Sequence, residues 1–311
     1  MPRTRYLIAA LVCSVLIAAT SVAADREPFD ALLREQAAHE KQQMAAGEMH
    51  TNCEAMAAFR QTAEMVRYPA GEFQLPGYLY KPDKAGKLPA VLWNHGSEKM
   101  PIGHPGLARF YTSNGFAFFM PIRHGHGNAP GKYIVDLQRE FKEKEPDNLV
   151  AWKNDVKLHE LYNADVIAAV KWLKSQPFVD PDRIIMTGVS YGGIQTLLAA
   201  EKGEGVRGFI PFAPAAMSFA NTELQERLKL AVKNAKAPVF LLQAENDYNI
   251  GPSKILAPIL EHRGSPNRSK VYPPFGKTNQ EGNGAFACWS LGITGWGTDV
   301  LDFIDAAFVQ K

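Results

Sequence analysis

The chain has 311 residues, long enough for one large domain or two modest ones. Apolar residues make up 46% of it and charged residues 21%, a balance that is ordinary for a globular protein and argues against disorder or a repeat array. The formal net charge of +2 is too small to suggest nucleic acid or an anionic membrane as a partner.

The first 24 residues differ in character from the rest of the chain. Arg3 and Arg5 precede an unbroken apolar run over residues 6–19, and the small residues that follow fit a signal-peptidase site. The run is short for a membrane span and no stop-transfer flank follows it, so residues 1–24 are predicted to be a cleaved secretory signal peptide. The mature chain is then expected to be periplasmic or extracellular, free of the membrane, and of zero formal charge.

Two cysteines, Cys53 and Cys288, belong to the predicted mature chain. In an oxidising compartment they would form one disulfide between an N-terminal arm and a late loop. Two buried thiols remain the alternative, because the sequence does not supply the Cα separation that a disulfide requires.

The segment after the leader, residues 25–60, is rich in Ala, Glu, Gln and Met and has no proline after Pro28. This composition favours helix, so we predict a helical N-terminal arm with a break near residues 47–52. From residue 63 the pattern changes to the alternation of apolar and polar side chains that is typical of strands. The antiparallel strands expected to open a sheet are residues 65–68, 73–75 and 78–80.

Short apolar runs then recur, and each is followed by a helical or loop segment. The expected strands are residues 89–93, 116–121, 184–187, 209–212, 239–243 and 270–272. The expected helices are residues 106–114, 157–175, 191–201, 223–234, 254–263 and 296–308. Continuous apolar strands that alternate with helices predict a mostly parallel sheet with helices on both faces, in one α/β domain over residues 61–311.

The stretch over residues 128–158 is less regular and mixes lysines and arginines with glutamates and aspartates. We interpret it as a charged, solvated face. A loop that borders a substrate site is the alternative, since insertions above an α/β sheet often shape access to it.

Residues 188–192, Gly-Val-Ser-Tyr-Gly, stand between a predicted strand and a predicted helix. A Gly-x-Ser-x-Gly motif in this context is typical of a nucleophile elbow, a sharp turn that exposes one side chain above the sheet. The following helix would direct its N–H groups and its positive dipole end at the same place. Ser190 is therefore the predicted nucleophile, and a glycine-rich turn without chemistry is the alternative.

A serine nucleophile needs a base, an acid that orients the base, and donors for the oxyanion. An early strand runs into His95-Gly96-Ser97, so the predicted oxyanion donors are the backbone N–H groups of Ser97 and of Tyr191, the residue after Ser190. His95 is expected to hold its own loop through a hydrogen bond rather than to act as the base.

The acid should follow the strand over residues 239–243. Asp247 lies in the loop beyond that strand and is the predicted acid of a catalytic triad. Glu245 is the second choice, because it stands nearer the end of the strand. A surface turn without function is the alternative for both.

Several segments together resemble the dienelactone hydrolase and prolyl-oligopeptidase-like branch of the α/β-hydrolase superfamily. They are Gly77–Pro82, Asn94–Gly96, Arg123–Gly127, Val179–Ile184, Gly188–Gly193 and Asp247. The resemblance covers most of residues 65–305 and implies the α/β-hydrolase fold. It also implies a serine hydrolase that acts on carboxylic esters or lactones without a cofactor or metal.

The family has a histidine before its last helix, and here the corresponding residue is Asn283. An amide has no basic lone pair near neutral pH, so Asn283 can accept a hydrogen bond from Ser190 but cannot take its proton. Its NH₂ group could instead bond Asp247 and keep the loop folded. We therefore expect turnover to be impaired in this sequence.

His124 and His126 are the alternative source of a base, since they follow a strand at the carboxyl edge of the sheet. Their His-Gly-x-Gly context favours packing in a tight turn, and no third ligand stands at a spacing that would suit a metal. Two other functions stay open: a non-catalytic small-molecule binding protein on the same fold, and a prolyl-oligopeptidase-like peptidase. The expected partner is a small-molecule ester or lactone rather than nucleic acid, and the oligomeric state does not follow from the sequence.

Overall fold

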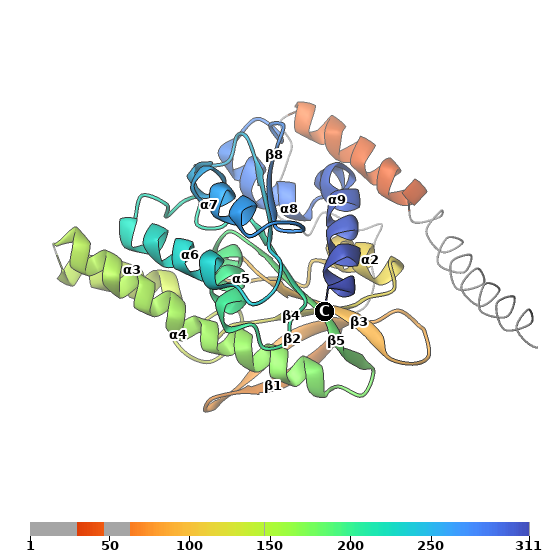
Figure 1. Cartoon of the computed structure of the whole chain (residues 1–311), viewed down its shortest axis with the longest axis horizontal. Coiled ribbons are helices and arrows are strands. Elements are labelled where there is room, and N and C mark those ends of the chain that lie inside the picture. The colour runs from red at the N-terminus through yellow and green to blue at the C-terminus, as the bar shows by residue number, and fades with distance from the viewer. Residues whose placement is uncertain (1–29, 47–62, 146, 311) are drawn as a thin grey trace, which may run out of the picture.

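The computed structural model describes residues 30–46, 63–145 and 147–310 (Figure 1). Its centre is a sheet of eight strands in the order β1-β2-β4-β3-β5-β6-β7-β8. The strands are β1 (Glu64–Ala70), β2 (Phe73–Tyr80), β3 (Leu88–Asn94), β4 (Ala117–Pro121), β5 (Val179–Val189), β6 (Gly208–Phe212), β7 (Phe240–Ala244) and β8 (Arg268–Tyr272). β2 is antiparallel to β1 and β4, and the other neighbouring strands are parallel. The predicted mostly parallel sheet is thus confirmed.

Helices cover both faces of this sheet. They are α2 (Pro105–Ser113), α3 (Ile134–Lys144), α4 (Asn148–Ser175), α5 (Tyr191–Lys202), α6 (Thr222–Asn234), α7 (Gly251–His262), the short α8 (Phe286–Cys288) and α9 (Ser290–Val309). One apolar core lies against α4 to α7, and the other against α2, α8, α9 and the helix over residues 30–46.

The alternation within each strand explains its apolar composition. In β3, Ala90 and Leu92 belong to the first core, whereas Val91 and Trp93 belong to the second. A strand buried on both faces needs apolar side chains at consecutive positions, which is why these segments are continuous runs in the sequence.

Two segments differ from the sequence-based expectation. The charged stretch over residues 128–158, expected to be less regular, forms α3 and the first part of α4. Asp147 stabilises the start of α4, because its side chain accepts a hydrogen bond from the Leu149 N–H at 2.8 Å. β2 is one continuous strand, so the turn after β1 is confined to Gly71 and Glu72.

Several predictions about the N-terminal region lie outside the described residues. They concern the signal peptide over residues 1–24, the break near residues 47–52 and Cys53. Cys288 is disulfide-bonded, but its pairing with Cys53 stays a prediction.

The mass of the mature protein tests the predicted removal of residues 1–24. Within the described part of the chain, none of the helices combines the length and apolar character that a membrane span requires.

The helix over residues 30–46, red in Figure 1, is attached to the domain through a buried carboxylate. Glu40 is only 1% exposed. Its Oε1 accepts a hydrogen bond from the Ser290 N–H at 3.2 Å, and its Oε2 accepts one from the Leu291 N–H at 2.7 Å. Both donors stand at the start of α9, which has no side-chain cap from its N-cap residue. Glu40 therefore supplies acceptors for these N–H groups and a negative charge at the positive end of the helix dipole.

The variant Glu40→Ala is expected to lower the free energy of unfolding by about 2 kcal/mol, because the first N–H groups of α9 lose a charged acceptor. Urea denaturation at pH 7 measures this loss. Glu35→Ala removes an exposed carboxylate from the same helix and should change the free energy of unfolding by less than about 0.5 kcal/mol. Equal losses in the two variants would contradict the role assigned to Glu40.

Candidate active site

Ser190 occupies a sharp turn between β5 and α5. Its backbone has φ 55° and ψ −113°, a conformation that a residue other than glycine rarely adopts. A Cβ on Gly188 would lie 2.6 Å from the Asn94 carbonyl oxygen, and one on Gly192 would lie 2.0 Å from it. The two glycines of the motif are therefore required by the close approach of β3, and the turn has the geometry expected of a nucleophile elbow.

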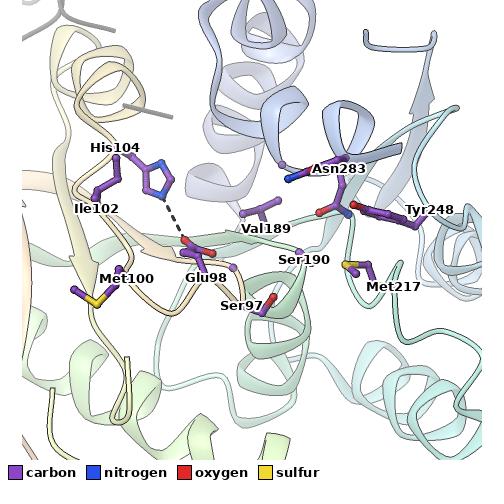
Figure 2. A pocket seen from close by; sticks show the side chains of 13 residues that line it. Ser97, Glu98, Met100, Ile102, His104, Val189, Ser190, Met217, Tyr248 and Asn283 are labelled. Carbon is purple, nitrogen blue, oxygen red and sulfur yellow. Dashed lines mark ion pairs between the residues drawn. The ribbon is translucent and has the colours of Figure 1, made fainter. Parts of the chain in front are cut away.

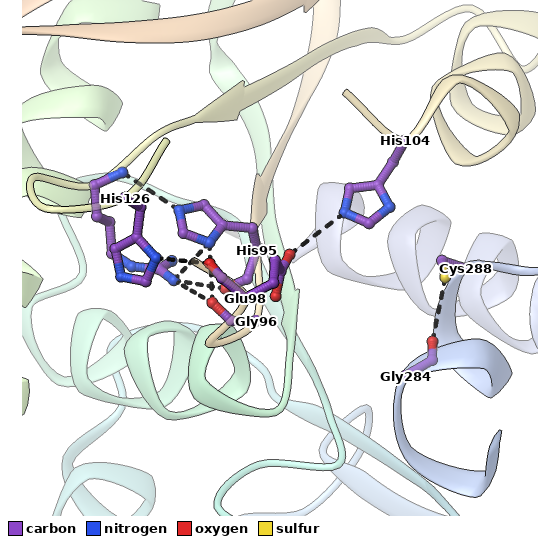
Figure 3. A network of polar contacts seen from close by, with 8 residues as sticks. His95, Gly96, Glu98, His104, His126, Gly284 and Cys288 are labelled. Carbon is purple, nitrogen blue, oxygen red and sulfur yellow. Dashed lines mark hydrogen bonds and ion pairs between the residues drawn. The ribbon is translucent and has the colours of Figure 1, made fainter. Parts of the chain in front are cut away.

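The predicted oxyanion loop follows β3 and is held by a buried arginine. Arg123 is fully buried, and its Nη2 donates hydrogen bonds to the carbonyl oxygens of His95 and Gly96, both at 2.7 Å (Figure 3). Its guanidinium also lies 4.5 Å from the centre of the Tyr191 ring. One cation thus contacts the loop that leads to Ser97 and the residue after Ser190, which carry the two predicted oxyanion donors.

His95 lies within this loop and is fully buried, as expected for a residue that holds its own loop. Its Nε2 accepts a hydrogen bond from the Arg123 backbone N–H at 3.3 Å, and its Nδ1 lies 2.9 Å from the Arg123 Nη2. Nδ1 is 2.9 Å from the Gly96 carbonyl oxygen. Burial and the neighbouring Arg123 charge hold the pKa of His95 well below its usual range. Both ring nitrogens are engaged, so His95 is not available as a base.

Asp247 and Asn283 are joined by a hydrogen bond. Asp247 follows β7, and Asn283 lies in the π-helical turn η3 (Glu281–Ala285); they are 7% and 6% exposed. The Asn283 Nδ2 donates to the Asp247 Oδ1 at 2.9 Å. Asp247 also accepts hydrogen bonds from the Tyr248 N–H at 2.7 Å and from the Gln243 Nε2 at 2.7 Å. The bond that the sequence suggested for the Asn283 NH₂ group is present.

The groups that donate hydrogen bonds to Asp247 in the described part of the chain are all uncharged. Burial raises the pKa of Asp247 to about 6, although the hydrogen bonds from Gln243, Asn283 and Tyr248 act in the opposite direction. Glu245, the second choice for the acid, is exposed. In a site with an imidazolium in place of the Asn283 amide, the opposite charge would lower this pKa.

One pocket brings most of these groups together. It has a volume of about 320 Å³, and Ser97, Ser190 and Asn283 line it (Figure 2). Asp247 contacts this pocket through Asn283. The Tyr191 side chain is buried against Arg123, which leaves its backbone N–H as the group that could serve the site.

His124 and His126 do not line the pocket that contains Ser190. The Nδ1 of His124 lies 2.6 Å from the Asp165 Oδ2, and its ring stacks on Tyr162. The Nδ1 of His126 lies 2.9 Å from the Glu98 carbonyl oxygen, and burial together with Arg123 lowers its pKa to about 3. Both rings are packed in the turn after β4. Among the residues that the structure describes, no group of three or more His, Cys, Asp or Glu side chains could hold a metal ion.

Two further polar residues of the pocket were not anticipated from the sequence. Glu98 and His104 both line it, and the His104 Nε2 lies 3.9 Å from the Glu98 Oε1 (Figure 2). Their position after the oxyanion loop, at the carboxyl edge of the sheet, was the available signal. It was too general to select them, because the path of the loop between Ser97 and α2 depends on tertiary packing.

The model of the dienelactone hydrolase family matches residues 75–276 of this chain. A curated acetyl esterase of Xylanibacter ruminicola is 28% identical over 147 residues, which are 46% of this chain and 33% of the esterase. The match thus spans about a third of that relative's length.

Solved structures share the fold at low sequence identity. An acylaminoacyl peptidase of Pyrococcus horikoshii is 17% identical, with a TM-score of 0.58 over 80% of this chain and 42% of the peptidase. Est1E of Butyrivibrio proteoclasticus, solved with ferulic acid bound, is 19% identical, with a TM-score of 0.55 over 77% of this chain and 99% of that protein. Both similarities concern the fold alone.

Proposed function

Because the chain belongs to the dienelactone hydrolase family, we propose that it is a serine hydrolase in which Ser190 attacks the carbonyl carbon of a carboxylic ester or lactone. The observation that carries this proposal is the strained backbone of Ser190, which lines a pocket together with Gly96 and Ser97 of the predicted oxyanion loop. Strain at a residue that lines a pocket is typical of a functional position.

The surroundings of Ser190 support attack on a carbonyl group. Negative charge that develops on the carbonyl oxygen would be stabilised by the backbone N–H groups of Ser97 and Tyr191. The buried Arg123 cation lies behind both and would add to this stabilisation, because a charge in a low-dielectric interior acts over a longer range than one in water. The acyl-enzyme ester would form on Ser190 Oγ as the bond from the carbonyl carbon to the alkoxy oxygen breaks. The alkoxy group would take up the serine proton to become an alcohol, and water would later release the acid.

This mechanism lacks a strong base to accept the proton of the Ser190 hydroxyl. Asn283 occupies the family's histidine position, and its Nδ2 is already directed at Asp247. Its remaining amide oxygen can accept a hydrogen bond but is not basic near neutral pH. We therefore propose that the chain binds its ester and turns it over slowly.

The Asn283–Asp247 bond also favours a second candidate, a non-catalytic protein that binds a small molecule in the same pocket. A peptidase of prolyl-oligopeptidase-like type is a third candidate, and the fold that the chain shares with acylaminoacyl peptidase is compatible with it. Reactivity at Ser190 separates the enzymes from the binding protein, and a comparison of ester with amide substrates separates the two enzymes.

A fluorophosphonate probe tests the nucleophile. The protein is expected to be labelled slowly, and Ser190→Ala is expected to abolish the labelling, because the phosphonate bonds the hydroxyl directly. Mass spectrometry of the labelled peptide identifies the modified residue. Ser97→Ala is the matched control, since it removes another hydroxyl of the same pocket and leaves Ser190 in place. Labelling that persists in Ser190→Ala, or that is absent even from Asn283→His, would exclude Ser190 as the nucleophile.

A further inference from the structure

The pocket beside Ser190 has an uneven distribution of charge. Among the residues that line it in the described part of the chain, Glu98 is the only carboxylate, and neither lysine nor arginine is present. The Glu98 side chain is 40% accessible. Burial raises the pKa of Glu98, but His104, the Glu98 N–H and the Arg123 charge together lower it below its ordinary value. The carboxylate is therefore ionised near neutral pH and faces the pocket.

Among the described residues Glu98 forms an ion pair with His104 at 3.9 Å, whereas Lys99 and Arg123 have other partners. Lys99, the next residue, pairs with Asp136 at 3.7 Å. Arg123 is fully buried behind the loop and directs its Nη2 at the carbonyl oxygens of His95 and Gly96. Apart from its contact with His104, the exposed Glu98 carboxylate is therefore open to a ligand.

His104 forms the second part of this subsite. It is 5% exposed, it lines the pocket, and neither of its ring nitrogens has a hydrogen-bond partner. Its left-handed backbone, with φ 44°, directs the chain into α2 from this point. Because a buried ring nitrogen without a partner is costly, the arrangement favours a ligand that supplies one. In Figure 2, His104 and Glu98 lie to the left of Ser190, whereas Asn283 lies to its right.

Apart from Glu98 and Gln280, the exposed side chains that line the rim of the pocket are apolar or aromatic. Met100, Met217 and Tyr248 line it with exposed fractions of 62%, 66% and 38%. Methionine and tyrosine side chains pack well against alkyl chains, and an aromatic face is compatible with a nearby cation. A carboxylate within an apolar rim suits an alkyl group that ends in a positive charge.

We propose that Glu98 and His104 form a subsite for an ammonium group, and that the substrate is an ester with this group in its acyl or alkoxy part. An ammonium group has three N–H donors and no acceptor. The two Glu98 oxygens and one ring nitrogen of His104 supply three acceptors when that nitrogen carries no proton. The inference rests on the proposed function for the ester bond, whereas the recognition of the cation depends only on the pocket.

Binding of matched esters to Ser190→Ala tests the subsite without turnover. Calorimetry compares 4-aminobutyl acetate with pentyl acetate, and methyl 6-aminohexanoate with methyl heptanoate, so that each pair differs by an ammonium in place of a methyl group. In at least one pair the cationic ester is expected to bind roughly tenfold more tightly. Combining Glu98→Gln with Ser190→Ala is expected to remove the difference in affinity within that pair. Salt at 0.5 M is expected to reduce the same difference in the Ser190→Ala protein.

Glu72→Gln is the matched control, because Glu72 is an exposed carboxylate in the turn after β1, and the preference should persist in it. His104→Asn keeps a residue that tolerates the left-handed backbone and should weaken the preference by removing the ring nitrogen. Equal binding within both pairs, or a preference that survives Glu98→Gln, would overturn the proposal. A preference for the cation without any hydrolysis by Asn283→His would reject the proposed function and support the subsite. Hydrolysis by Asn283→His without a preference for the cationic ester would support the proposed function and reject the subsite.

Discussion

The variant Asn283→His is expected to raise kcat/KM for 4-nitrophenyl acetate by roughly 10²–10⁴-fold, the usual contribution of a positioned general base. The Asn283 Nδ2 already lies 2.9 Å from the Asp247 Oδ1, so an imidazole there can donate Nδ1–H to the same oxygen. Its Nε2 would then be directed at the pocket that Ser190 lines. The rate should rise with pH through the pKa of the new histidine, ordinarily near 6.5.

Two controls define this gain. Asn283→Ala removes the amide without adding a base and is expected to give no increase. Ser190→Ala in the Asn283→His protein is expected to abolish the gain, because the new base acts only through the serine. The mechanism is contradicted by a native protein that already hydrolyses the ester as fast as Asn283→His, or by a gain that survives the loss of Ser190.

The variant Asp247→Asn is expected to remove a large pH dependence of stability. The folded-state pKa of about 6 is above the ordinary value of 3.8, so the folded protein holds the Asp247 proton more tightly than the unfolded chain does. This contribution to stability is complete below pH 3.8 and is lost as the pH rises through about 6. The free energy of unfolding of the native protein should therefore fall by about 2–3 kcal/mol, relative to Asp247→Asn, between pH 4 and pH 8.

Urea denaturation of both proteins across this pH range measures the difference, which cancels the titration of all other groups. Glu245→Gln is the matched control, because it neutralises an exposed carboxylate two residues away and should leave the pH dependence unchanged. Parallel curves for the native protein and Asp247→Asn would show that the Asp247 carboxyl titrates normally in the folded state.

The strands and the elbow were predictable because their signals are local. A strand buried on both faces must be apolar at consecutive positions, as β3 is. The glycines on either side of Ser190 are required by a backbone approach that recurs wherever this turn forms. The charged stretch over residues 128–158 was expected to be less regular than the two helices that it forms, because its helical character depends on the cap at Asp147 and on packing against the domain.

The residues of the pocket could be predicted only in part from local sequence signals. Asp247 and Asn283 could be paired in advance, because both follow strands at the same edge of the sheet. Glu98 and His104 could not be selected, because their meeting depends on how the segment after β3 turns before α2. The role of Glu40 could not be predicted either. It contacts Ser290 and Leu291, which follow it by 250 and 251 positions in the chain.

The sequence by itself determined the family and the mostly parallel sheet, and it predicted a sharp turn at Ser190 and an amide, Asn283, where the family is expected to have its histidine. These follow from residue types at short spacing, which constrain the backbone wherever the rest of the chain lies. Only the tertiary structure decided that Arg123 contacts both the loop before Ser97 and the Tyr191 ring, that His124 is bonded to Asp165, and that Glu98 and His104 share the pocket. Contacts between distant segments arise from how the layers pack, and side-chain burial then sets which charges a ligand meets.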